Sequence, residues 1–281
     1  MEDASRRSAE TGGELEIAKQ TTSRIGKRPI WSGAITIGLV NVPVKLYTMV
    51  YERGVSFRFL HKDDSQPLRY ERVCIKDEKV VPWENVVKGY EVSKDRFIVL
   101  QKEELKAAKP ESDRKIRIDK FIDYLSIDPI YLERPYALAP DKSEDAYGLL
   151  LTALQKIGKA GVGRITLRDK EYLALVHPYK GALVLTTLRY AYEVADPGSL
   201  EELKALKEPS KDELDLARKI ITDLSGEFDI TQYADNYTDK VEALIQSKMK
   251  GETIQVERPV KEEAKELMVA LQETLKQLKK K

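Results

Sequence analysis

The stretch Ile30–Tyr47 constrains the fold most, because large apolar residues in it alternate with small or polar ones. From Trp31 to Leu39 the odd positions are apolar, and the even positions are small or carry a hydroxyl. This period of two predicts a β-strand with one buried face and one face open to close approach. After Asn41 the phase inverts, which predicts a bulge or corner near Gly38 to Pro43. Pro43 itself predicts an edge or a new strand start. The residues alone indicate two bent strands of a barrel or sandwich.

The composition describes a chain that can bury a core. Its 281 residues are 42% hydrophobic and 34% charged, which is typical of globular proteins. We expect no transmembrane helix and no membrane partner, because no run of about eighteen apolar residues occurs. The N-terminus lacks the apolar segment of a secretory signal. The single cysteine, Cys74, excludes an internal disulfide framework and fits a reducing cytoplasm.

The charge is balanced overall but unevenly distributed. The net charge of +1 gives no general argument for nucleic acid. Between Gly158 and Tyr190, however, six Lys and Arg accompany two Asp and Glu, whereas between Glu193 and Asp229 five accompany eleven. Such asymmetry allows one face to attract an anion. Two ordinary solvated surfaces would look the same, so both interpretations stay open here.

The first half of the chain reads as a polar leader followed by short strands. Residues 1–27 have no sustained apolar period, which predicts a disordered leader. Residues 47–104 alternate in short β-type runs around 55–59, 68–72 and 97–100, with a turn cluster at Lys62–Pro67. Cations recur here without forming a block. Extended arms could carry them to the phosphates of a duplex, and a generic solvated surface is the alternative.

The second half changes from strands to helices. An amphipathic helix is predicted from an N-cap at Ser143 to Gly158, followed by three antiparallel strands at 163–168, 172–177 and 181–189. On the first of these strands we expect Arg164, Thr166 and Arg168 to share one face, an arrangement that suits phosphate.

Three helices are expected after residue 195. The first follows a capping box at Ser210–Glu213, and the second opens at Thr238. The last is amphipathic and spans Val260–Lys281. A terminal helix of this kind either docks on its own domain or is offered to a partner.

Several separate segments resemble one known family, in order and in spacing. They are IWSGAITIGLVNVPVKLY at 30–47, FLHKDDSQPLRYERVC at 59–74, VVKGYE at 86–91, RFIVLQKEEL at 96–105, IDPIY at 127–131 and ELMVALQETLKQL at 266–278. These segments resemble the prokaryotic (bacterial) Ku family, whose members bind DNA ends in non-homologous end joining. The resemblance covers residues 29–278.

The resemblance implies an α+β fold and a division into parts. A Ku-type antiparallel β-barrel of seven strands (core, 28–195) would contain an inserted β bridge (47–104) that arches over DNA. A helical arm (196–256) and a C-terminal ligase-interacting helix (257–281) would follow. A ring-shaped homodimer would then bind double-stranded DNA ends without reading sequence, and would recruit and stimulate a multifunctional ATP-dependent DNA ligase. The protein would be cytoplasmic and nucleoid-associated.

The resemblance also assigns candidate residues. The expected contacts with the DNA backbone are Lys45, Arg58, Lys62, Arg69, Arg72, Lys88, Lys94, Arg164 and Arg168. The expected contacts with the ligase are Leu267, Met268, Leu271 and Leu275. Some bacterial relatives carry a Cys-x-x-Cys pair at the turn that here reads Cys74 to Asp77, and a lone cysteine cannot complete a tetrahedral zinc site.

We expect no cofactor, no metal and no catalytic residue, hence a non-catalytic DNA-binding protein. Two other hypotheses stay open. One is a lyase that processes abasic ends, in which a lysine such as Lys45 would form a Schiff base. The other is an architectural DNA-binding scaffold without preference for ends.

Overall fold

A computed structural model describes residues 25–51, 54–108, 113–251 and 267–278. The chain divides into two compact units. The barrel unit comprises the described parts of Met1–Glu52 and Val81–Val194, and the second unit comprises those of Arg53–Val80 and Ala195–Lys281. The predicted leader lies almost entirely outside the described residues. The predicted bridge, 47–104, is split between the two units.

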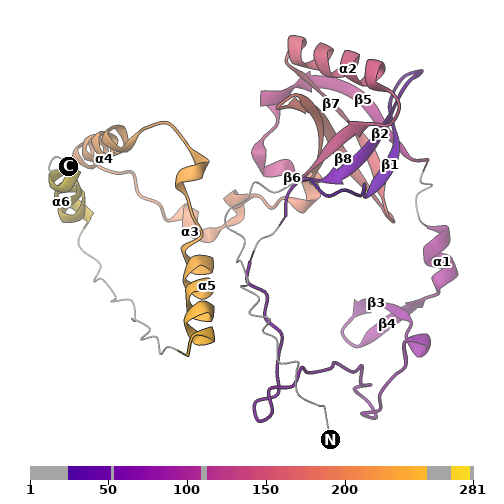
Figure 1. The fold of residues 1–281 in the computed structure, drawn as a ribbon. Helices are drawn as coiled ribbons and strands as arrows, with labels where there is room; N and C mark the ends of the chain where they lie inside the picture. Colours follow the sequence, from indigo (N-terminus) through magenta and orange to yellow (C-terminus); the bar gives the residue numbers. More distant parts are fainter. Residues whose placement is uncertain (1–24, 52–53, 109–112, 252–266, 279–281) are drawn as a thin grey trace, which may run out of the picture. The chain divides into compact units, whose positions relative to one another are not determined.

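The barrel unit is built on a closed sheet of seven strands (Figure 1). Around the barrel their order is β1 (Trp31–Ile37), β2 (Val40–Thr48), β6 (Leu132–Pro140), β9 (Ala182–Leu188), β8 (Lys170–Tyr179), β7 (Lys159–Leu167) and β5 (Lys115–Asp123). The expected antiparallel barrel is confirmed, with one exception. Strands β1 and β5 run parallel, pairing Ala34–Thr36 with Lys115–Arg117. The barrel therefore closes between strands that are far apart in the sequence.

The opening stretch forms the β1–β2 hairpin. Its turn consists of Gly38, with φ +57°, and Leu39, which is 99% exposed. The inversion of phase is therefore this turn, which lies within the range predicted for a bulge or corner, Gly38 to Pro43. The chain turns there without a bulge, because the pairing continues unbroken from Ile37 and Val40. Pro43 pairs with Ala34 of β1, and the named ladder to β6 begins at the next residue. Its carbonyl accepts from the amide of Asp141, just beyond β6 (3.0 Å), and the proline, which has no N–H, cannot return that bond, so the β2–β6 ladder ends here.

The core fills the barrel interior and is closed at one end by α2 (Glu144–Ile157) (Figure 1). Ile35, Ile116 and Ile165 are at most 1% exposed inside it. Tyr147 of α2 donates its hydroxyl to the carbonyl of Leu138 (2.7 Å) and accepts from the amide of Leu183 (2.8 Å). Helix α2 is thereby hydrogen-bonded to two strands of the barrel.

The predicted limits of α2 are confirmed, but its expected cap differs. Gly158 ends the helix with φ +69°, which a residue without Cβ adopts at low cost. Ser143 is the N-cap residue, yet its hydroxyl donates to the carbonyl of Pro43 (2.6 Å) and accepts no helix N–H. This serine therefore links α2 to β2.

Between β2 and β5 lies a long insertion, residues 49–114. Its regular elements are a 3₁₀ turn (Trp83–Asn85), β3 (Lys88–Ser93), β4 (Arg96–Leu100) and α1 (Lys102–Ala107). The predicted strand near 97–100 is confirmed as β4, but those near 55–59 and 68–72 are wrong. Only the isolated bridges Leu60–Pro67 and Val73–Val80 occur there. Phe57 and Phe59 are 69% and 73% exposed, so their alternation matches no buried sheet face.

The region after the barrel is helical, as predicted. It contains α3 (Glu201–Lys204), α4 (Lys211–Leu224), α5 (Asn236–Met249) and α6 (Leu267–Leu278). The capping box of α4 is confirmed: the Ser210 hydroxyl accepts from the amide of Glu213 (3.3 Å), and the Glu213 carboxylate accepts from the amide of Ser210 (2.7 Å). Helix α5 begins two residues before Thr238, because Asp235 accepts the amides of its first turn.

Short 3₁₀ helices connect the longer elements. They span Tyr124–Ser126, Pro129–Tyr131, Ala191–Glu193, Pro197–Ser199 and Ile230–Gln232. Across the described residues, no helix has the length and apolar character needed to cross a bilayer.

Candidate nucleic-acid interface

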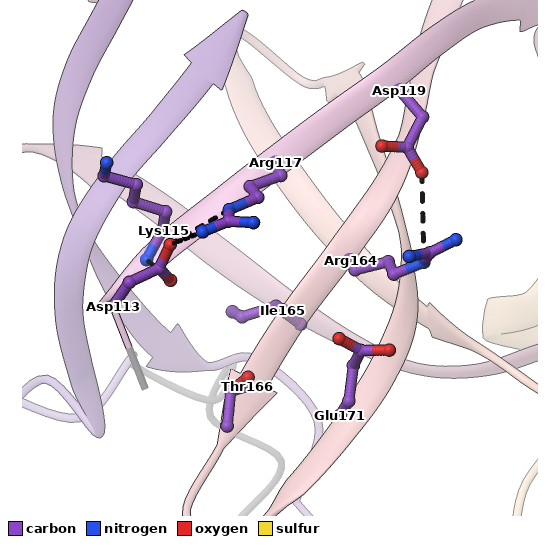
Figure 2. Close-up of a pocket in the computed structure, with 8 residues that line it drawn as sticks. All are labelled: Asp113, Lys115, Arg117, Asp119, Arg164, Ile165, Thr166 and Glu171. Carbon is purple, nitrogen blue, oxygen red and sulfur yellow. Dashed lines mark hydrogen bonds and ion pairs between the residues drawn. The ribbon is translucent and has the colours of Figure 1, made fainter. Parts of the chain in front are cut away.

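The outer face of β5 and β7 carries a pocket lined by charged side chains (Figure 2). Ile116 and Ile165 are paired across these strands and point into the core, with 0% and 1% exposure. Their neighbours therefore point outward, as the alternation of a strand requires. Arg117 and Arg164 lie directly opposite each other in this ladder, and Lys115 lines the same pocket.

Acidic side chains are interleaved with these cations (Figure 2). Asp113 accepts from Arg117, with Nε and Oδ2 2.9 Å apart, whereas Arg164 Nε lies 3.9 Å from Asp119 Oδ2. Arg117 is therefore engaged by its own chain. Arg164, whose side chain is 58% exposed, is held only at the limit of an ion pair. Exposed pairs of this kind are worth little and exchange readily with phosphate.

The predicted face of Arg164, Thr166 and Arg168 is only partly correct. Arg164 and Thr166 lie on β7 and line the pocket. Arg168 lies beyond the strand, in the turn to β8, with φ +58°. Because the turn breaks the alternation, Arg168 does not extend that face.

Lys45 is held by an ion pair within the barrel unit. Its Nζ lies 2.7 Å from Asp141 Oδ1, and the two side chains are about one third exposed, 36% and 31%. The hydrogen bond to Asp141 raises the pKa of Lys45 above its ordinary value, while partial burial acts in the opposite direction. A Schiff base requires the neutral amine. Lys45 is thus better suited to an ionic contact than to lyase chemistry.

The remaining predicted DNA contacts are exposed and divided between the units. Lys88 and Lys94 lie on and beside the β3–β4 ribbon. The second unit contains Arg58, Lys62, Arg69 and Arg72. Arg69 makes an ion pair with Glu71 at 2.5 Å. Of the nine predicted residues, only Arg164 lines the pocket on β5 and β7.

The prediction omitted two cations of this pocket, Lys115 and Arg117. The sequence does indicate that both lie on the outer face of a strand, because they alternate with Ile116 and Ile118. The sequence does not indicate that β5 pairs with β7, and this pairing places Arg117 opposite Arg164.

Cys74 and Asp77 close a tight turn in the second unit. The carboxylate of Asp77 interacts with the Cys74 thiol and with the Lys79 backbone, and these hydrogen bonds lower its pKa. The amide of Cys74 donates to the carbonyl of Lys79 at 2.9 Å. Protein hydrogen bonds therefore organise this turn. Within the described ranges, no three histidine, cysteine or acidic residues are grouped closely enough to hold a metal ion.

The predicted ligase contacts lie on α6, which packs against α4 of the second unit (Figure 1). Leu275 is 8% exposed and Leu271 is half-buried. A terminal helix was expected either to dock on its own domain or to be offered to a partner, and in the structure α6 is docked on α4. The side chains of Leu267 and Met268 lie outside the described residues.

A family model described as "Ku70/Ku80 beta-barrel domain" matches residues 36–216, which run from the end of β1 through the other six barrel strands and into α4. The chain belongs to the Ku family. The resemblance of the separate segments to Ku is thereby confirmed, as is the seven-stranded barrel that it implied.

Curated Ku relatives match over most of their length. A protein of Anaeromyxobacter sp. (strain K) is 43% identical over 250 residues, 88% of this chain and 83% of that protein. One of Archaeoglobus fulgidus is 36% identical over 90% of this chain and all of its own length. One of Bacillus subtilis (strain 168) is 33% identical over 92% and 84%. Each is named "Non-homologous end joining protein Ku".

Proposed function

We propose that this protein binds the ends of double-stranded DNA without base readout, as a homodimeric ring, and acts in non-homologous end joining. Membership of the Ku family and the name shared by its relatives support the role in end joining. The observation that carries the binding mode is the insertion. It leaves the barrel after β2 and re-enters at β5, and both of these strands pair with β1. A segment anchored at both ends can form part of a closed loop.

A closed loop explains a preference for ends by topology alone. Only a free terminus can thread it, and the contacts need reach no further than phosphate and sugar. Such contacts carry no sequence information. The proposal therefore accounts for binding of any DNA end by a chain whose net charge is only +1.

The homodimer is supported by the β3–β4 ribbon. Both of its faces carry apolar side chains: Tyr90 pairs with Ile98 on one face, and Val99 faces outward on the other, all three about half exposed or more. Among the described elements, β3 and β4 make extensive contacts only with each other. An isolated two-stranded ribbon is marginally stable in water, and exposed apolar surface marks association sites. A second copy of the chain would supply the missing cover.

The decisive experiment compares a linear duplex with a covalently closed circle of the same sequence. A threading ring binds the linear DNA and fails to bind the circle. Equal affinity for both would refute the ring and favour an architectural scaffold. Trapping of the protein on abasic DNA by borohydride would instead favour the lyase hypothesis.

The backbone contacts have a test of their own. We propose the nine predicted cations, with Arg164 as the member at the pocket on β5 and β7. Replacing one phosphate-contacting cation should reduce the salt slope, the dependence of log affinity on log salt, by about one unit. Charge reversal at several positions that leaves both affinity and slope unchanged would show that the assignment is wrong.

We further propose that α6 is the element that recruits an ATP-dependent DNA ligase. Since Leu271 and Leu275 face α4, ligase binding through them requires α6 to leave α4. Deleting residues 260–281 should spare end binding and abolish stimulation of the ligase. Leu275→Ala should weaken ligase binding, and Lys276→Ala, on the exposed side of the helix, is the matched control. Stimulation that survives the deletion would refute this role.

A further inference from the structure

A stacked pair of tyrosines follows β9. The rings of Tyr190 and Tyr192 are nearly parallel, 7° apart, with centroids separated by 5.3 Å. Tyr190 is half-buried, whereas Tyr192 is 80% exposed. One face of the Tyr192 ring is thus supported by Tyr190, and most of the residue is open to solvent. The fold gains little from an aromatic residue placed in this way.

The tyrosine pair adjoins the charged pocket on β5 and β7. Glu171 of β8 is directly opposite Thr166 of β7, and both line that pocket. Leu173 pairs with Leu188 across the antiparallel strands β8 and β9. Glu171 comes two residues before Leu173 and Tyr190 two residues after Leu188. The same register, continued past the end of β9, therefore places Tyr190 beside Glu171. Burial raises the pKa of Tyr190. The negative charge of Glu171 adds to this effect, and the cations Arg164 and Lys170 oppose it. These charged groups therefore lie within electrostatic range of the tyrosine pair.

The cationic part of the pocket can receive a phosphate. Among the described residues, Lys115 has no ion-pair partner, and Arg164 has only the 3.9 Å contact with Asp119. The hydroxyl of Thr166 adds a hydrogen-bond donor to the same pocket, because Thr166 lies two residues after Arg164 on the outer face of β7. Arg117 is hydrogen-bonded to Asp113 and is not counted among the groups that would bind the phosphate. An ammonium, a guanidinium and a hydroxyl on one surface form a suitable phosphate site.

Glu171 supplies the complementary chemistry for a base. An ionised carboxylate only accepts hydrogen bonds, and it repels phosphate. It can accept from the exocyclic amino group of cytosine or adenine, which thymine lacks. Glu171 stands between the cations and the tyrosines, at the place where the edge of a base would lie if its phosphate were at Arg164 and its ring on Tyr192.

From this arrangement we infer that the outer face of β5, β7 and β8, together with Tyr190 and Tyr192, binds an unpaired nucleotide of a single-stranded overhang. The inference rests on the proposed binding of DNA ends and extends it to their single-stranded part. A base within a duplex presents no free face to an aromatic side chain, whereas an unpaired base stacks on it at little cost. The site favours cytosine and adenine over thymine through Glu171.

The test uses the full-length protein and duplexes that carry a short 3′ or 5′ overhang of dC or of dT, with a blunt duplex as reference. The dC overhang of one polarity should bind about tenfold more tightly than the blunt end, in the range expected for stacking of a base on an aromatic ring. Tyr192→Ala should remove this gain, and Tyr192→Phe should retain it. Glu171→Ala should remove the difference between dC and dT.

Tyr233→Ala is the matched control, because Tyr233 is also an exposed tyrosine in an aromatic pair, with Phe228 in the second unit. It should leave the overhang gain intact. Equal binding of overhang and blunt ends, or a gain that survives Tyr192→Ala, would overturn the inference while leaving end binding in place. Equal binding of linear and circular blunt DNA would instead refute the proposed ring.

Discussion

Gly163 provides a direct test of the barrel, because β5 leaves no room for a Cβ at this position of β7. An added Cβ would overlap the carbonyl oxygen of Arg117 and would lie 2.6 Å from its carbonyl carbon and 2.8 Å from Ile118 Cα. These are backbone atoms of the neighbouring strand, at a shift in register between Ile118 and Lys120. They cannot rotate away as a side chain could. Gly163→Ala therefore forces the ladder apart.

Overpacking of a core costs about 1–3 kcal/mol, and a clash with the backbone of the neighbouring strand places this variant at the upper end or beyond. With a urea m-value of about 2 kcal/mol/M, a loss of ~3 kcal/mol lowers the midpoint of unfolding by about 1.5 M. The fluorescence of Trp31 reports on this unfolding, since this residue packs against the barrel core, whereas Trp83 is 71% exposed.

Gly148→Ala is the matched control in the same unit. Gly148 lies within α2, and an added Cβ there would meet nothing within 4 Å. Alanine in place of glycine inside a helix should stabilise the protein by about 0.5–1 kcal/mol. If Gly163→Ala unfolds within about 0.5 M urea of the original chain, the register of β5 and β7 described above is wrong.

Three further predictions follow from polar groups. Burial lowers the pKa of His177 below its ordinary 6.5. Below about pH 6.5 the unfolded chain therefore binds a proton at this residue more readily than the folded chain, and the urea midpoint should fall as the pH drops. His177→Gln should flatten this pH dependence. Asp119→Asn releases Arg164 and should raise DNA affinity by up to about fivefold in titrations at fixed salt, whereas unchanged or weaker binding would contradict the role of Arg164. Ser210→Ala removes the cap of α4 and should cost about 1 kcal/mol, seen as faster amide hydrogen exchange in that helix; unaltered exchange would refute the cap.

The barrel strands were predictable because each has a local signal. Ile116, Ile165 and their neighbours alternate with polar residues, and the strands end at turn residues. The resemblance to Ku supplied the number of strands, which alternation alone does not contain. Alternation was misleading in the insertion, where Phe57 and Tyr70 find no sheet to cover and remain largely exposed.

The candidate site was less predictable, because it depends on pairs that are distant in the sequence. Lys45 meets Asp141 only because β2 pairs with β6. Arg117 faces Arg164 only because β5 pairs with β7. Charge and periodicity predict on which face of a strand such residues lie. Which strand lies next to it in the sheet depends on tertiary packing, which the local sequence does not show.

The parallel pairing of β1 with β5 has a consequence for the protein after proteolysis. A cut within the insertion would leave β1 and β2 on one fragment and β5 to β9 on the other. The ladders β1–β5 and β2–β6 cross between these fragments, so the barrel should survive the cut. The severed insertion, however, would become two separate arms. A proposed ring cut in this way would open and bind circular DNA, which the same ring would exclude while intact.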